Sequence, residues 1–304
     1  METIFKSENL CKKYGSFSAL CGLDMEIRKG EIYGFVGKNG AGKTTLIRLL
    51  CGLQQPTSGS FTLMGKANDD KELYRERRRI GAVVESPAIF KDMSAKDNII
   101  QQYLMLGLPD MKGADELLKL VGLEDTGRKK AKNFSLGMKQ RLGLAIALCG
   151  QPDFVILDEP TNGLDPQGII EIRELILKLN REQGITFLIS SHILDELSRL
   201  ASCYGFIDKG RMVRQMTAEE LQKECRKSVR MKVSDTGILA KIMDEKGLEY
   251  KILDKDLADV YAEVNFSEMA EAFAKENCTI FKMEEHDESL EAFYLALLGG
   301  EKDA

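Results

Sequence analysis

The sequence has little that would place the chain in a membrane or in an oxidising compartment. No apolar run of about 18 residues occurs, so we expect no membrane-spanning segment. Residues 1–6 contain no apolar signal region. The seven cysteines are an odd number, are scattered and form no C-x-x-C pair, which argues against a disulfide framework and against a zinc site. A reducing cytoplasm is the simplest expectation.

The sequence also lacks the strong positive charge of a nucleic-acid-binding protein. Its net charge is −5 over 304 residues, a length that allows one large domain or two. The arginines between Arg75 and Arg79 share a predicted helix with Glu72 and Glu76. This mixture of charges favours a solvated helix face over a nucleic-acid patch.

Strands and helices alternate in the first two thirds of the chain. Residues 1–36 are rich in strand-forming sequence, and residues 154–157 form the continuous apolar run expected of a strand buried on both faces. An amphipathic helix at 169–182 and another apolar run at 185–189 follow. Strand, helix and strand in this order predict a parallel α/β sheet.

A change of pattern divides the chain into two domains. We assign residues 1–215 to the α/β domain, with a helical subdomain at about 86–150. In residues 216–304 the elements follow in the order βαββαβ, which favours a small α+β accessory domain of the ferredoxin-like type. This second domain has no phosphate-binding or metal-binding pattern, so we expect it to be regulatory or to support a dimer.

Residues 37–45, GKNGAGKTT, match the phosphate-binding pattern G-x-x-x-x-G-K-[ST] at every fixed position. The glycines let backbone N–H groups face phosphate oxygens, Lys43 reaches the β and γ phosphates, and Thr44 offers a hydroxyl to Mg²⁺. A predicted strand before the loop and a helix after it complete an anion site. The predicted nucleotide-binding residues are Gly37, Lys38, Asn39, Gly40, Ala41, Gly42, Lys43, Thr44 and Thr45.

Two acidic residues, Asp158 and Glu159, follow the apolar run at 154–157. A carboxylate at the end of a buried strand can hold Mg²⁺, and a neighbouring glutamate can orient and deprotonate a water. The alternative is an acidic pair that faces solvent.

The segment 134–141, FSLGMKQR, resembles the signature motif of the ABC ATPase family, with Leu136 where many members have glycine. In that family the signature serine and glycine contact the γ-phosphate held by the P-loop of a second copy. The resemblance therefore implies nucleotide contacts for Ser135, Gly137 and Gln140. Taken alone, Ser135 would equally suit an ordinary helix N-cap.

Other segments resemble further motifs of the family, in family order over residues 2–215. Asp165 closes a segment similar to the D-loop, and His192 matches the switch histidine that contacts the γ-phosphate. Tyr14 matches the aromatic residue that stacks on adenine, although a packed surface tyrosine is the alternative.

One departure from the family pattern is Glu85, where most members carry a glutamine that can ligate Mg²⁺. This acidic variant resembles the bacitracin and lantibiotic resistance branch of ABC exporters. A loop carboxylate that faces solvent is the alternative.

Together these motifs imply a P-loop NTPase of the ABC ATPase type, with ATP and Mg²⁺ as cofactors. Two copies would sandwich two MgATP, with Thr44, Glu85 and Asp158 at the metal, Glu159 as general base, and Lys43 and His192 on phosphate. The resemblance implies a homodimer at the inner face of the cell membrane that drives a separate permease and exports antimicrobial peptides or drugs. No nucleic-acid partner is expected.

Two rival functions remain at this point. A soluble ABC protein acting on nucleic acid or ribosomes would resemble members with a long coiled coil or with two cassettes in one chain. Here there is a single cassette, in which Asp158 lies 115 positions after Lys43, with no heptads between them. A regulatory module that does not hydrolyse ATP is disfavoured because Glu159 is present.

Overall fold

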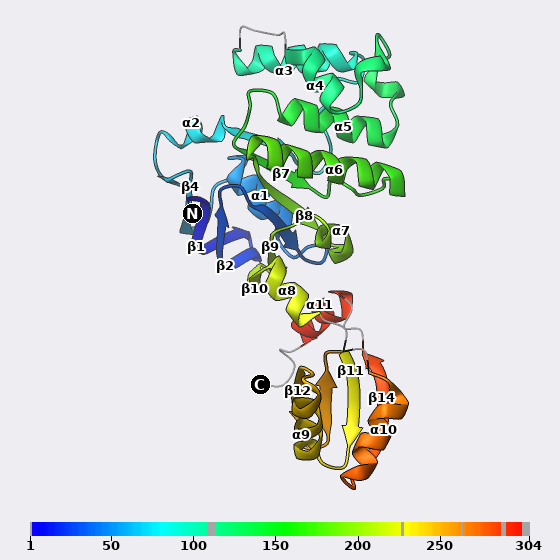
Figure 1. The fold of residues 1–304 in the computed structure, drawn as a ribbon. Helices are drawn as coiled ribbons and strands as arrows, with labels where there is room; N and C mark the ends of the chain where they lie inside the picture. The colour runs from blue at the N-terminus through cyan, green and yellow to red at the C-terminus, as the bar shows by residue number, and fades with distance from the viewer. Residues whose placement is uncertain (1, 109–112, 226–227, 263, 287–289, 300–304) are drawn as a thin grey trace. The chain divides into compact units, whose positions relative to one another are not determined.

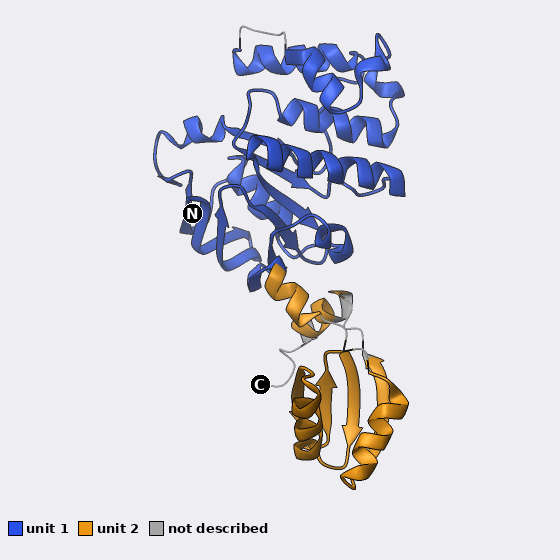
Figure 2. Ribbon diagram, viewed as in Figure 1, with its two compact units in different colours: residues 1–218 blue, residues 219–304 orange. Residues whose placement is uncertain are grey.

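The computed structural model describes the chain except residues 1, 109–112, 226–227, 263, 287–289 and 300–304. It divides into two compact units, residues 1–218 and residues 219–304 (Figure 2). The packing of the chain defines this division, and the functions assigned to the two parts stay predictions.

Unit 1 contains two sheets. An antiparallel sheet has the strand order β2-β1-β4-β5, and a larger sheet has the order β10-β9-β3-β8-β7-β6. In the larger sheet only the β9–β10 pair is antiparallel among the described pairings, as expected where helices connect successive strands. The strands are β1 (Thr3–Tyr14), β2 (Phe17–Arg28), β3 (Ile32–Val36), β4 (Ser58–Leu63), β5 (Lys66–Ala67), β6 (Ile80–Val83), β7 (Phe154–Asp158), β8 (Thr186–Ser191), β9 (Cys203–Asp208) and β10 (Arg211–Thr217).

The helices of unit 1 fall into two groups. Helices α3, α4 and α5 lie together at one end of this unit, away from the strands β1 and β2 (Figure 1). The remaining helices cover or follow the larger sheet. The helices of this unit are α1 (Lys43–Leu50), α2 (Leu73–Arg77), α3 (Ala95–Leu106), α4 (Gly113–Leu120), α5 (Leu136–Ala147), α6 (Pro166–Gln183) and α7 (Leu194–Ser198), with short 3₁₀ turns at Glu124–Thr126 and Ala131–Asn133.

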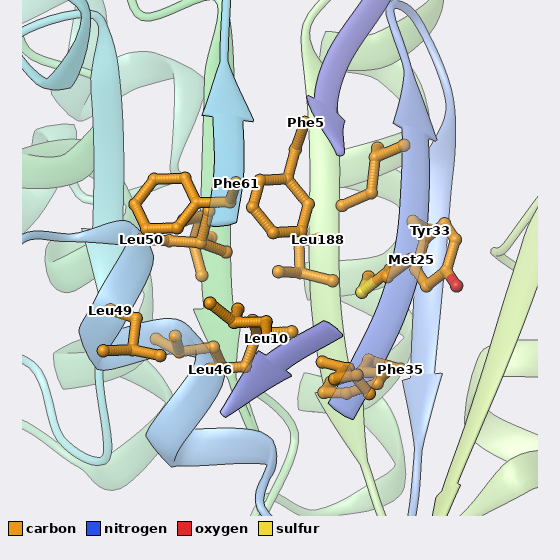
Figure 3. Close-up of a cluster of buried hydrophobic side chains, with 14 of the residues drawn as sticks. Phe5, Leu10, Met25, Tyr33, Phe35, Leu46, Leu49, Leu50, Phe61 and Leu188 are labelled. Carbon is orange, nitrogen blue, oxygen red and sulfur yellow. The ribbon is translucent and has the colours of Figure 1, made fainter. Parts of the chain in front are cut away.

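A buried apolar cluster fixes helix α1 against both sheets. Leu46, Leu49 and Leu50 point from one side of the helix toward Phe5 and Phe61 of the antiparallel sheet (Figure 3). All five side chains are 2% exposed or less. Complete burial of side chains this large stabilises the packing by about 1.5–3 kcal/mol each. The first turn of α1, which carries Lys43 and Thr44, is therefore held rigidly by its own hydrophobic face.

Two helices begin earlier than the hydrophobic pattern predicts. The small and apolar residues at 142–148 predict a helix there, but α5 begins at Leu136, because the Ser135 hydroxyl accepts a hydrogen bond from the Met138 N–H and caps the helix. Helix α6 begins at Pro166 rather than at 169, because Asp165 caps it. Capping residues and proline are not part of the pattern of apolar residues, so a prediction from that pattern alone places both helix starts too late.

Unit 2 contains a four-stranded antiparallel sheet of order β12-β13-β11-β14. Strand β13 lies between β11 and β12, which is the split βαβ arrangement. Its core includes Met231, Met243 and Phe273. The elements are α8 (Ala218–Glu224), whose first residue belongs to unit 1, β11 (Ser228–Val233), α9 (Thr236–Lys246), β12 (Tyr250–Asp254), β13 (Leu257–Val260), α10 (Phe266–Lys275), β14 (Ile280–His286) and α11 (Leu290–Gly299).

Candidate nucleotide site

The phosphate-binding loop joins β3 to α1 and depends on its glycines. Gly40 and Gly42 have φ values of 82° and 114°, which side chains rarely tolerate. A Cβ on Gly42 would lie 2.6 Å from the Ala19 carbonyl oxygen, and one on Gly37 would lie 2.8 Å from the Ile207 carbonyl oxygen. The loop is therefore wedged between β2 and β9, and glycine is required for the close approach.

Lys43, Glu159 and His192 form a connected chain of charged and polar groups. The Lys43 ammonium donates to the Gly37 carbonyl oxygen at 2.5 Å and lies 3.2 Å from Glu159 Oε1. The other oxygen of Glu159 lies 2.7 Å from His192 Nδ1. Lys43 is 6% exposed, so its charge is neutralised by oxygen atoms rather than by bulk water.

Asp158 is the buried centre of a second network. Its Oδ2 accepts a hydrogen bond from the Thr44 hydroxyl at 2.9 Å, and its Oδ1 accepts one from the Ser190 hydroxyl at 2.5 Å. The same Ser190 oxygen accepts from the Glu159 N–H at 3.1 Å. Sequence reasoning missed Ser190, whose only visible signal was its position two residues before His192.

A hollow of about 250 Å³ opens beside these networks. It offers backbone N–H groups, the Lys43 ammonium and the Thr44 hydroxyl on one side and the Glu159 carboxylate on the other. This combination suits a polyanion with a bound cation. The lining residues are Phe17, Ala19, Asn39, Gly40, Gly42, Lys43, Thr44, Thr45 and Glu159.

Two aromatic side chains lie near the end of β1. Tyr14 is 41% exposed, its hydroxyl donates to the Gln54 side-chain oxygen, and the Lys12 ammonium lies 5.3 Å from its ring centroid. Phe17 is 61% exposed and lines the hollow itself. Phe17 is thus a second candidate for contact with a nucleobase or ribose. It was not singled out from the sequence, although an aromatic three residues after Tyr14 was a readable signal.

Glu85 lies at the same edge of the sheet as Asp158 but pairs with a different group. It follows β6, the parallel neighbour of β7, and adopts a left-handed φ of 60°. Its carboxylate forms an ion pair with Arg48, one helical turn beyond Thr44 on α1. Among the contacts of the described residues, none joins Glu85 to Thr44 or Asp158, so its role as a metal ligand stays a prediction.

The signature residues lie apart from the phosphate-binding loop of their own chain. Ser135 is exposed, whereas Gln140 is buried on α5. Leu136, 46% exposed, lies close to the D-loop segment, since a Cβ on Gly163 would lie 3.0 Å from its Cδ2 atom. Asp165 is exposed and caps α6. Within the described residues, no hydrogen bond or ion pair joins Ser135 or Asp165 to Lys43.

Burial holds two thiols of unit 1, Cys51 and Cys149, in their neutral form. Burial raises the pKa of the Cys51 thiol to about 12, against a lowering by Arg77 and with a further increase from Asp158. Burial also raises the pKa of Cys149 to about 12. A neutral thiol is a poor nucleophile and a poor metal ligand, so neither cysteine is a chemical group of the site.

Comparison with known proteins identifies the family. Residues 20–162 match the family model described as ABC transporter. The chain is 38% identical over 303 residues to the bacitracin transport ATP-binding protein BcrA of Bacillus licheniformis, and the match covers 99% of each chain. The chain belongs to the ATP-binding subunits of ABC transporters. It is also 45% identical over 210 residues to the lantibiotic transport ATP-binding protein SrtF of Streptococcus pyogenes, covering 69% of this chain and 89% of that protein.

A solved ABC cassette has the same fold. The dimeric, post-hydrolysis structure of the ATP-binding cassette MJ0796 with ADP and Pi superposes with a TM-score of 0.63 at 27% identity, covering 70% of this chain and 98% of that one. The predicted ABC ATPase fold and the predicted function as an ATP-binding transporter subunit are confirmed. In the part of the chain that the structure describes, no helix has the length and apolar composition needed to cross a bilayer.

Proposed function

We propose that this ABC subunit binds MgATP in the hollow beside α1 and hydrolyses it with Glu159 as the general base. The observation that carries the proposal is the Lys43–Glu159–His192 chain, with contacts of 3.2 and 2.7 Å, next to the Asp158–Thr44 pair. The phosphate-binding Lys43, the base Glu159 and its polar partner His192 thus meet at the ends of the neighbouring strands β3, β7 and β8.

The residues present fit a magnesium ion. The Thr44 hydroxyl and the Asp158 carboxylate are hard oxygen donors 2.9 Å apart, and Mg²⁺ typically takes one or two protein oxygens together with nucleotide phosphates. Thr44 and Asp158 would hold the ion, with Glu85 as the further candidate oxygen donor. When bound, Mg²⁺ neutralises charge on the β and γ phosphates.

The chain's own side chains explain how nucleotide binding would prepare the base. Lys43 is shared between loop carbonyls and Glu159, so a phosphate that takes up the ammonium weakens its hold on that carboxylate. His192 contacts Glu159 through Nδ1 and so orients that carboxylate, while the other ring nitrogen, Nε2, would face the γ-phosphate. Glu159 is then positioned to accept a proton from an attacking water.

We further propose that two copies complete two sites. The exposed Ser135 with Gly137, Gln140 and Asp165 would contact the nucleotide held by the partner's loop. Within the described residues no hydrogen bond or ion pair joins Ser135 or Asp165 to Lys43 of the same chain, which is compatible with this arrangement, and the dimeric state of the MJ0796 cassette supports it.

The partner in transport would be a separate permease at the cytoplasmic face of the membrane. A hollow of about 420 Å³ beside α3 and α5 includes the exposed apolar side chains of Phe90 and Met105, and suits an apolar segment of such a partner. The names of the two relatives support export of antimicrobial peptides or drugs. Residues 216–304, with their split βαβ arrangement, would form a ferredoxin-like accessory domain that regulates or supports the dimer.

The variant Glu159→Gln tests the proposed base. It keeps the shape of the side chain but cannot accept a proton, so ATP binding persists while the turnover rate falls by roughly 10²–10⁴-fold. The variant should accumulate as an ATP-bound dimer in size-exclusion chromatography. Turnover close to that of the wild type would show that another group is the base.

A further inference from the structure

Thr161 and Glu196 connect the two loops that carry Glu159 and His192. Strands β7 and β8 are parallel neighbours, with Asp158 opposite Ser190, and each catalytic side chain lies on the first residue after its strand. The hydrogen bonds of the sheet therefore do not fix the positions of Glu159 and His192 relative to each other. Beyond that point, the Thr161 hydroxyl donates a hydrogen bond to Glu196 Oε2 on α7, across 35 residues of sequence.

The surroundings make this bond strong and hard to replace. Thr161 and Glu196 are half-buried and line a nearly filled hollow of about 10 Å³, together with apolar side chains. A space of this size lies at the lower limit for a single water molecule, so little solvent shares the bond in the wild type. Arg173 also lines the hollow, and its guanidinium forms its ion pair with Glu174. A hydrogen bond to a carboxylate in such a low-polarity setting is costly to break.

The segment after β7 needs anchors because it starts in an unfavourable conformation. Glu159 has a left-handed φ of 50°, which costs a residue with a side chain on the order of 1–2 kcal/mol. The Asn162 N–H donates to the Glu159 carbonyl oxygen at 3.2 Å, and the Leu164 N–H donates to the Thr161 carbonyl oxygen at 3.1 Å. These bonds shape the turn within itself. The Thr161–Glu196 bond ties the turn to the helix that follows His192.

We infer that Glu196 is a positioning residue that, through Thr161, holds Glu159 and the residues 162–165 in register with His192. The inference rests on the proposed function. Without this bond, Glu159 can relax away from its left-handed conformation and lose its alignment with His192. The phosphate-binding loop lies on β3 and α1, which this bond does not touch, so nucleotide affinity should persist while the chemical step slows.

Steady-state ATP hydrolysis by the full chain tests the inference. Thr161→Val removes the hydroxyl at constant shape, whereas Thr161→Ser keeps the hydroxyl. At the other partner, Glu196→Gln keeps an acceptor oxygen, whereas Glu196→Ala removes it. Thr161→Val and Glu196→Ala should each lower kcat by roughly 10- to 100-fold, with KM for ATP within about two-fold of the wild type. Thr161→Ser and Glu196→Gln should restore most of the rate. Asp195→Asn, an exposed neighbour on α7, is the matched control.

The double variant separates coupling from general damage. If the two residues act through one bond, Thr161→Val combined with Glu196→Ala is no slower than the slower single variant. Three results would each overturn the inference and leave the proposed ATPase intact. They are a double variant whose loss of kcat is the product of the two single losses, an unchanged kcat in Thr161→Val, and an effect of the variants on KM alone. Should Glu196→Ala fail to fold, the Thr161 pair alone carries the test. A folded wild type that binds ATP without hydrolysing it would contradict the proposed function itself.

Discussion

Replacing Ser190 by alanine should destabilise the fold and raise the Mg²⁺ concentration that hydrolysis requires. Ser190 is fully buried, and its hydroxyl donates to Asp158 at 2.5 Å and accepts from the Glu159 N–H at 3.1 Å. The Glu159 N–H keeps a second acceptor, the Ser190 carbonyl oxygen at 3.2 Å, so that donor is not orphaned. The main loss is one hydrogen bond to a charged carboxylate, which contributes about 1.5–3 kcal/mol.

This loss of free energy predicts measurable shifts in Tm and in the Mg²⁺ titration. A loss of about 2 kcal/mol in a unit of this size lowers Tm by roughly 4–8 °C, at about 2–4 °C per kcal/mol. Asp158 would keep Thr44 as a partner but would rotate more freely, and loss of such an outer partner typically weakens metal binding by about 10- to 100-fold. A Mg²⁺ titration of ATPase activity should therefore shift to higher concentration, alongside the fall in Tm.

Thr186→Val supplies the matched control at the opposite end of the same strand. Thr186 is also fully buried, and its hydroxyl accepts a hydrogen bond from the Gly30 N–H at 2.9 Å. This variant should lower Tm by a few degrees, on the order of 1 kcal/mol, without moving the Mg²⁺ titration. If Ser190→Ala behaves like Thr186→Val, or retains both the wild-type Tm and the wild-type titration, the assigned role of Ser190 is wrong.

Three further predictions concern the rest of the site. Glu85→Gln should retain ATPase activity because an oxygen donor survives, whereas Glu85→Ala should need more Mg²⁺; coincident titrations of wild type and Glu85→Ala would contradict this. Phe17→Ala should raise the Kd for ATP by about ten-fold through loss of aromatic contact, as seen in a fluorescent-nucleotide titration, and an unchanged Kd would exclude Phe17 from the site. Between pH 9 and 12 the folded chain keeps the Cys149 proton that the unfolded chain loses, so the free energy of unfolding should fall as pH rises. Urea denaturation should show this decline, and Cys149→Ala should make it less steep, with the part that Cys51 contributes remaining.

Much of the site was predictable because its signals are local in sequence. The phosphate-binding loop is a run of nine residues whose glycines and lysine have fixed spacing, and the structure gives Gly40 and Gly42 the positive φ values that explain those glycines. Asp158 and Glu159 were predictable because a buried apolar run announces a strand and its end. In each case one short segment of sequence contained both the signal for the strand or loop and the reactive side chains.

The contacts that tune these residues were not predictable in the same way. Ser190 meets Asp158 across 32 residues, Glu196 meets Thr161 across 35, and Arg48 meets Glu85 across 37. Each pair depends on which strands are neighbours and on their register, and a single sequence specifies neither. Serine, threonine and arginine are also common surface residues, so their types alone carried no signal.

The geometry of α1 shows why Glu85 should be considered together with Arg48. Thr44 and Arg48 are four residues apart and therefore share one face of the helix. That face meets two adjacent strand ends, with Thr44 against Asp158 after β7 and Arg48 against Glu85 after β6. By the resemblance to the family, Glu85 stands where most members carry a neutral glutamine, and its ion pair with Arg48 offsets the added negative charge. The buried leucine face of α1 thus fixes the positions of both the Thr44–Asp158 pair and the Arg48–Glu85 pair.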